Sequence, residues 1–214
     1  MNLTDFEAIL FDMDGTLVDS EVLWRVAEKD TVSKHGGTLT EEVQALFLGL
    51  KVEESAEIMR EKCGLAASAR TLAQDIETRV KELLPEVKDQ KGAVAFIEAV
   101  NGLELPKAIV SNSTFDIIET TLAHKEWSKY FEKRFSAEQV THAKPAPDIY
   151  LMASEALNVN IKNCLVIEDS LTGVKAGVSA GATCIAIPEH EADKFKDFTP
   201  YVFESLTQAL KALS

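Results

Sequence analysis

The sequence predicts an α/β fold, a doubly wound parallel sheet with a cap of four helices inserted after the first strand. Three observations support this prediction. An unbroken apolar run over residues 8–11 is typical of a buried parallel strand, and it is followed at once by the carboxylates Asp12 and Asp14. Helical periodicity then persists for about 70 residues after Thr16. From Gly92 onward, strands and helices alternate, as in parallel sheets with right-handed crossovers.

The inserted stretch contains start and stop signals for four helices. Serine and threonine are favourable N-cap residues, and glycine or proline commonly ends a helix. The expected helices run from Ser20 to Gly36, from Thr40 to Gly49, from Val52 to Cys63 and from Ser68 to Pro85. We therefore expect a catalytic core of residues 1–17 and 89–214 and a helical cap of residues 18–88.

The second half of the chain reads as alternating helices and strands. A proline at position 147 suits the first turn of a helix, and apolar runs such as 164–168 are typical of buried strands. Expected helices are 93–100, 116–123, 147–157, 173–180 and 206–213, and expected strands are 107–111, 134–136, 164–168, 183–187 and 201–203.

Charge and composition exclude several classes of function. The chain has 35 acidic and 22 basic side chains and a net charge of −13, so nucleic acids and anionic membranes are unfavourable partners. Cys63, Cys164 and Cys184 lack metal-ligand spacing, and the last two read as buried free thiols. No apolar run approaches ~20 residues. We expect a cytoplasmic protein that is a monomer or a weak homo-oligomer.

Polar side chains recur where the predicted strands end, at the edge where open α/β sheets bind their ligands. Two carboxylates as close as Asp12 and Asp14 require a divalent metal, one protonated partner, or both. Carboxylates suit Mg²⁺, and phosphoryl transfer needs mainly positioning and charge neutralisation. The residues expected to converge are Asp12, Asp14, Ser111, Asn112, Lys144, Glu168 and Asp169.

These residue types suggest roles in phosphoryl transfer. Asp12 is placed to attack phosphorus, and Asp14 to protonate the leaving oxygen and then activate water. Ser111 and Lys144 would hold the oxygens of the transferring group, and Asn112 next to them is expected to bind substrate. Taken singly, each has a structural alternative as a turn residue, a helix cap or a surface charge. The prediction depends on their joint position.

Four segments resemble, in order and spacing, the motifs of the haloacid dehalogenase superfamily. They are DMDGTLVDS at 12–20, VSN at 110–112, KPAPD at 144–148 and IEDS at 167–170. With a helical insert after the first motif, the chain is similar to the branch that contains sugar-phosphate phosphatases and beta-phosphoglucomutases. The resemblance extends over essentially the whole chain.

The resemblance implies a Rossmann-like core with Asp12 as nucleophile and Asp14 as acid and base. It also implies Mg²⁺ bound by Asp12, the main-chain carbonyl of Asp14, and Asp169, with Glu168 in or next to the coordination shell. Dehalogenases of this superfamily lack the second carboxylate, so Asp14 argues against carbon–halogen cleavage. Mutases carry a cap histidine at about the place of Trp24, so hydrolysis is favoured.

The expected function is a Mg²⁺-dependent phosphatase of small phosphorylated metabolites, such as hexose phosphates or phosphogluconate. Glu21, Trp24 and Lys51 in the cap are the candidates for substrate selection. A packed cap aromatic and a solvated lysine are the alternative readings of the last two. A phosphomutase is the second enzymatic hypothesis. A phosphorylatable receiver-like signalling module is the non-enzymatic one, although the insert and Asp14 argue against it.

Overall fold

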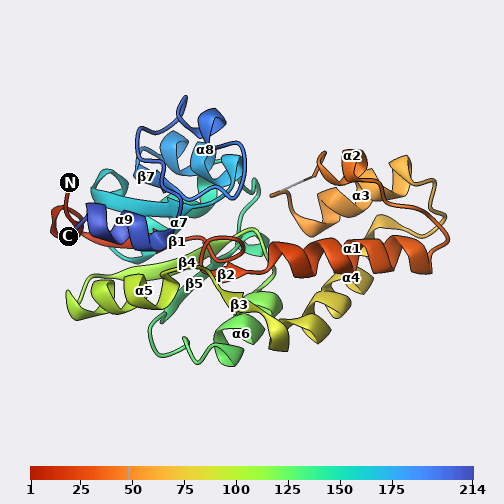
Figure 1. Cartoon of the computed structure of the whole chain (residues 1–214), viewed down its shortest axis with the longest axis horizontal. Coiled ribbons are helices and arrows are strands. Elements are labelled where there is room, and N and C mark those ends of the chain that lie inside the picture. Colours follow the sequence, from red (N-terminus) through yellow and green to blue (C-terminus); the bar gives the residue numbers. More distant parts are fainter. Residues whose placement is uncertain (48) are drawn as a thin grey trace. The chain divides into compact units, whose positions relative to one another are not determined.

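The computed structural model describes residues 1–47 and 49–214 (Figure 1). The chain divides into two compact units. The core unit contains Met1–Asp19 and Lys88–Ser214, and the helical unit contains Ser20–Val87. The chain passes between them through β2 (Val18–Asp19) and β3 (Lys88–Asp89), which pair antiparallel.

The core unit is built on a five-stranded sheet in the order β5-β4-β1-β6-β7, with all four strand pairs parallel. Strand β1 lies in the centre, where Leu10 is in register with Ala108 on one side and Val166 on the other. All four β1 residues are buried, which explains the unbroken apolar run. The strands are β1 (Ala8–Phe11), β4 (Lys107–Ser111), β5 (Lys133–Ser136), β6 (Cys164–Glu168) and β7 (Thr183–Ala186).

Alternation along β1 sends side chains to two packed layers. Leu10 belongs to a cluster that includes Tyr150 of α7 and Val174 of α8. The neighbouring Phe11 makes edge-to-face contacts with Phe96 of α5 and with Phe131, at ring-centroid distances of 5.8 and 5.7 Å. The sheet is therefore covered on both faces, as expected for a doubly wound fold. The core helices are α5 (Ala93–Gly102), α6 (Phe115–His124), α7 (Asp148–Ala156), α8 (Leu171–Ala180) and α9 (Leu206–Ala212), with short 3-10 turns at Leu3–Asp5, Ala137–Gln139, Ile161–Asn163 and Ala192–Phe195.

The helical unit contains four α-helices in its described residues, which confirms the helical cap. They are α1 (Glu21–Lys34), α2 (Glu41–Gln44), α3 (Val52–Lys62) and α4 (Ala69–Leu83), followed by a 3-10 turn at Leu84–Glu86. The predicted caps Thr40 and Ser68 accept hydrogen bonds from the backbone amides of Val43 and Thr71, each the third residue of its helix. Ser20 is the N-cap residue of α1, as predicted, but its side chain makes no capping hydrogen bond. Its backbone is helical (ψ −13°) rather than extended, and a capping side chain needs the extended conformation.

The strand predicted at 201–203 is reduced to a single parallel bridge. Only Val202 forms an isolated bridge, to Ala186, with one backbone hydrogen bond on either side of it. Pro200 precedes this segment and has no amide hydrogen to extend the ladder, and Ser205 already caps α9. The pairing therefore stops at a single bridge.

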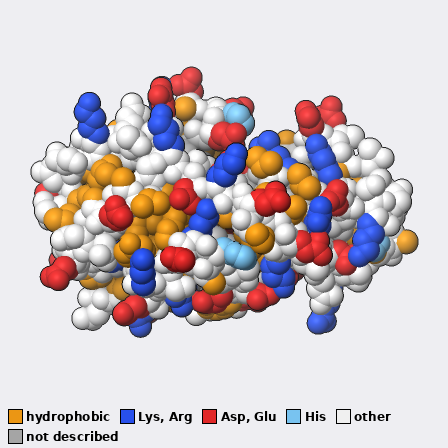
Figure 2. Space-filling model, turned by 60° about the horizontal axis from the view of Figure 1, so that its bottom comes forward, with side chains coloured by type: hydrophobic (Ala, Val, Ile, Leu, Met, Phe, Trp, Pro, Cys, Tyr) orange, Lys and Arg blue, Asp and Glu red, His pale blue; other side chains and the backbone are white. Residues whose placement is uncertain are grey.

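Other predictions concern the thiols and membrane association. Cys164 and Cys184 are free and buried, as expected. Across the described residues, no helix has both the length and the apolar character needed to cross a bilayer. On the face shown in Figure 2, acidic and basic side chains are interspersed.

Candidate active site

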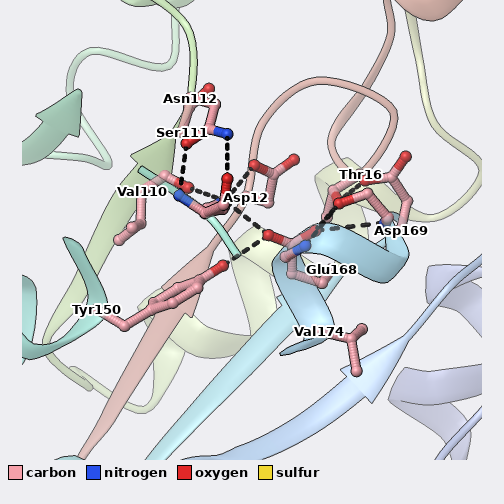
Figure 3. Close-up of polar contacts among 12 residues, drawn as sticks. Asp12, Thr16, Val110, Ser111, Asn112, Tyr150, Glu168, Asp169 and Val174 are labelled. Carbon is pink, nitrogen blue, oxygen red and sulfur yellow. Dashed lines mark hydrogen bonds and ion pairs between the residues drawn. The ribbon is translucent and has the colours of Figure 1, made fainter. Parts of the chain in front are cut away.

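The carboxyl ends of three neighbouring strands bring the predicted polar residues to one edge of the core sheet (Figure 3). Asp12 follows β1 directly, and its amide donates to the carbonyl of Ile167 in β6 (3.0 Å). Ser111 is the last residue of β4, and Glu168 is the last residue of β6. The joint position on which the sequence-based interpretation depended is therefore present.

Lys144 lies in the centre of this group and is almost fully buried, with 3% of its surface exposed. Its ammonium donates to Asp12 Oδ1 (2.7 Å), to Glu168 Oε1 (2.6 Å) and to the main-chain oxygen of Val110 (2.8 Å). A lysine has three donors, so these three acceptors satisfy it. This burial and pairing exclude the alternative reading of Lys144 as a surface charge.

Burial and the neighbouring charges shift the pKa values of Asp12 and Lys144. Burial raises the pKa of Asp12 well above its usual value, and the nearby Glu168 carboxylate adds to the rise, while Lys144 opposes it. For Lys144 burial disfavours the charge, but the two carboxylates outweigh burial and raise its pKa. Lys144 is therefore held as a cation, and its single positive charge cannot neutralise both of the carboxylates that it contacts.

Three carboxylates form a candidate metal site. Asp12, Glu168 and Asp169 each offer an oxygen, and these oxygens all lie within 4.8 Å of one another. Thr16 Oγ1 donates to Asp169 Oδ1 (3.0 Å) and thereby orients that side chain. An oxygen-only donor set with partial neutralisation by one lysine fits Mg²⁺, which binds to few carboxylates and retains waters. Gly15 has a φ of +79°, and a Cβ there would collide with the Asp169 carboxylate, so the motif's glycine makes room for it.

Asp14 lies beside two hydroxyl groups. Ser113 Oγ donates to Asp14 Oδ2 at 2.7 Å and Ser111 Oγ at 3.3 Å. Ser111 Oγ in turn accepts from the Ser113 amide (3.0 Å). The structure thus brings Asp14 and Ser111 together as predicted and adds Ser113.

Asn112 makes contacts with the main chain of Lys144. Its Oδ1 accepts from the Lys144 amide (3.2 Å), and its Nδ2 donates to the Lys144 carbonyl (3.3 Å). Both ends of the side-chain amide therefore hold the loop that carries Lys144. Its expected part in substrate binding stays a prediction.

Sequence reasoning missed several residues of this site. Thr16 lies inside the first motif, and Ser113 directly follows the second. Because side chains alternate along extended chain, Ser113 could have been expected on the same side as Ser111, as a second hydroxyl. Tyr150, whose hydroxyl donates to Glu168 Oε1 (2.7 Å), had no such signal, because an aromatic residue inside a helix reads as core packing.

The three cap candidates, Glu21, Trp24 and Lys51, belong to the helical unit. Glu21 pairs with Arg25 one turn along α1 (3.0 Å). Lys51 precedes α3 and is half-buried, as is Trp24. Their role in substrate selection stays a prediction.

Comparison with known proteins agrees with this site. Residues 9–187 match the model of the haloacid dehalogenase-like hydrolase family. The chain is 33% identical over 183 residues to the 6-phosphogluconate phosphatase of Escherichia coli, and the alignment covers 84% of this chain and 81% of that protein. It is 30% identical over 176 residues to a phosphorylated carbohydrates phosphatase of Thermotoga maritima, with 82% of each chain covered.

A crystal structure of a family IA haloacid dehalogenase hydrolase from Entamoeba histolytica is also similar. It superposes with a TM-score of 0.85 at 28% identity and covers 94% of each chain. The resemblance found in the four motifs and the expected enzyme class, a phosphatase of this type, are thereby confirmed. The chain belongs to the haloacid dehalogenase-like hydrolase family.

Proposed function

We propose that this protein is a Mg²⁺-dependent phosphatase of small phosphorylated sugars, such as hexose phosphates or phosphogluconate, and that it works through an aspartyl-phosphate on Asp12. The observation that carries the proposal is the buried ammonium of Lys144 between Asp12 and Glu168, next to three clustered carboxylates. Relatives that are phosphatases of 6-phosphogluconate and of phosphorylated carbohydrates support the substrate class.

In the proposed reaction, Asp12 is the nucleophile. Lys144 holds Oδ1 of Asp12, so Oδ2 is the oxygen that attacks phosphorus. The new Oδ2–P bond forms as the bond between phosphorus and the sugar oxygen breaks. Lys144 also keeps Asp12 oriented, since Val110 and Glu168 fix the ammonium from the other sides.

Asp14 acts as the acid and then as the base. In the first step its carboxyl proton passes to the leaving sugar oxygen. In the second step its carboxylate takes a proton from water as the water oxygen attacks phosphorus, which frees Asp12 and releases inorganic phosphate. Ser113 and Ser111 hold Asp14 by its Oδ2.

Asp12, Asp169 and the main-chain carbonyl of Asp14 are the groups that would hold Mg²⁺, with Glu168 in or next to the coordination shell; the three carboxylates lie clustered. When bound, Mg²⁺ supplies positive charge next to the transferring phosphoryl group and offsets its repulsion by the carboxylates. Asp169 is preset for this role by Thr16, whose hydroxyl fixes one of its oxygens.

We further propose that the insert 18–88 is a substrate-selecting cap of a core formed by 1–17 and 89–214. Glu21, Trp24 and Lys51 would set the preference among sugars. An indole face suits the apolar side of a sugar ring, and a lysine or a glutamate suits its charged or hydroxyl groups.

A panel of phosphomonoesters tests the function. Purified protein is incubated with hexose phosphates, 6-phosphogluconate, glycerol phosphate and a nucleotide, with Mg²⁺ or with a chelator, and inorganic phosphate is measured. We expect release from the sugar phosphates, loss of activity with the chelator, and its return when Mg²⁺ is restored. Asp12→Asn is the inactive control.

Three other results would overturn the proposal. Isomerised sugar phosphate without free phosphate, after addition of a sugar bisphosphate, would indicate a phosphomutase. Slow labelling of the protein without turnover of any metabolite would indicate a receiver-like module. Full activity of Asp12→Asn would exclude Asp12 as the nucleophile.

A further inference from the structure

Tyr150 lies at the bottom of the candidate site. It is on α7, its side chain is fully buried, and its hydroxyl donates to Glu168 Oε1 at 2.7 Å (Figure 3). The face of its ring lies 5.0 Å from the ammonium of Lys144. One side chain therefore touches both an acidic and a basic member of the site.

Glu168 is held from all sides by protein groups. Oε1 accepts from both Lys144 (2.6 Å) and Tyr150, and Oε2 accepts from the hydroxyl (3.1 Å) and the amide (3.4 Å) of Ser170. Gly173 lies against the carboxylate so closely that a Cβ at that position would overlap it. The carboxylate is therefore fixed in one orientation by its donors and by the shape of its surroundings.

The ring of Tyr150 contributes packing, and its hydroxyl contributes a hydrogen bond. The ring fills the apolar layer formed with Ala153 and Val174, and a phenylalanine would fill the same volume. The hydroxyl is a polar group in a dry core, where an unpaired hydroxyl is unfavourable, and its partner here is an oxygen of the candidate metal site. Packing alone thus accounts for an aromatic residue at position 150 but not for a tyrosine.

We propose that Tyr150 is a positioning residue, whose hydroxyl fixes Glu168 beside Lys144 and so maintains the spacing of the three carboxylates for a divalent cation. The inference rests on the metal site of the proposed function. Without the hydroxyl, Oε1 retains one donor, Lys144, and the carboxylate is held less tightly beside Asp12 and Asp169 by Lys144 and Ser170. Groups that orient metal ligands in this way commonly change metal affinity by 10- to 100-fold when removed.

The test is direct binding of Mn²⁺, which shares the preference of Mg²⁺ for carboxylate oxygens and whose free concentration is read by electron paramagnetic resonance. Substrate is absent, so the readout does not depend on activity. For Tyr150→Phe we expect the Kd for Mn²⁺ to rise at least about tenfold. The matched control is Tyr130→Phe, which removes the hydroxyl of a half-buried tyrosine whose ring lies against Lys129, and it should leave the Kd unchanged.

A second measurement separates positioning from a general loss of structure. Because the hydroxyl acts on metal binding, saturating Mg²⁺ should return kcat of Tyr150→Phe to within about threefold of the wild-type value, with the KM for the sugar phosphate unchanged. An unchanged Kd for Mn²⁺, a loss of kcat that saturating Mg²⁺ does not repair, or unfolding below the assay temperature would each overturn the proposal. If the wild-type protein itself binds no Mn²⁺, the metal site of the proposed function fails instead.

Discussion

A buried glutamate makes the stability of the helical unit dependent on pH. Glu28 on α1 is 9% exposed, and its Oε2 accepts a hydrogen bond from Gln44 Nε2 of α2 at 2.6 Å. Burial raises the pKa of Glu28 to about 7 from a reference value of 4.5, against the opposing effects of the Gln44 hydrogen bond and of Arg25 and Lys29. Glu21 adds slightly to the rise.

The direction of the effect follows from proton binding in the two states. Between pH 4.5 and pH 7 the folded protein holds a proton on Glu28 that the unfolded chain has released, so folding is favoured at low pH and the free energy of unfolding falls as pH rises. One pKa unit corresponds to about 1.4 kcal/mol. The shift therefore removes about 3 kcal/mol between pH 4 and pH 8, and this loss is complete above the folded-state pKa.

Glu28→Gln tests this directly, because glutamine has the same shape, cannot ionise and still offers an oxygen to Gln44. We expect the variant to exceed the wild type in free energy of unfolding by about 3 kcal/mol at pH 8 and to match it near pH 4. Trp24 is the tryptophan of the helical unit, so both proteins are made in a Trp127→Phe background and urea unfolding is followed by Trp24 fluorescence. Glu42→Gln, an exposed change on α2, is the control. Parallel pH profiles for wild type and Glu28→Gln would refute the reasoning.

Three further predictions concern the site and the cap. Asp14→Asn should lower kcat by ~10²–10⁴-fold with little change in KM, because it removes the proton donor and keeps the shape; steady-state kinetics on the best sugar phosphate checks this, and unchanged kcat would exclude the role. Gly173→Ala should lower the free energy of unfolding by about 1–3 kcal/mol and reduce activity, because the added methyl group displaces the Glu168 carboxylate. Urea unfolding measures the stability and phosphate release measures the activity. Wild-type values in both assays would show that the position of this carboxylate does not matter. Trp24→Ala and Lys51→Ala should change the ranking of substrates by kcat/KM while Mg²⁺ dependence is retained, and an unchanged ranking in both would remove the cap assignment.

Residues along strands and at helix starts were the most predictable from the sequence. The apolar run of β1 and the cap residues Thr40 and Ser68 are local signals, and the structure follows them. The strand predicted at 201–203 is reduced to one bridge because strand formation depends on a partner, and Pro200 has no amide hydrogen to extend the pairing. Ser20 occupies the predicted N-cap position, but its side chain does not cap the helix, because the backbone conformation and not the residue type decides whether a hydroxyl reaches the first amides.

The candidate site also has features that local sequence signals predict and features that depend on distant segments. The residues in the four motifs converge because parallel strands end at one edge, which the sequence pattern predicts. The pairings within the site were not predictable. Lys144 bonds three acceptors from three segments, Asn112 holds the backbone of Lys144, and Tyr150 reaches Glu168 from another helix. Such contacts depend on packing between distant segments, and no local pattern encodes them.

The central claim is that Asp12 becomes phosphorylated during turnover. Wild-type protein is mixed rapidly with Mg²⁺ and a reactive sugar phosphate and quenched in acid, and the phosphorylated peptide is located by mass spectrometry. We predict one phosphoryl group on Asp12 that appears before free phosphate accumulates and that is absent in Asp12→Asn. Steady release of phosphate with no phosphoryl group on Asp12 at any time, together with turnover by Asp12→Asn, would contradict it.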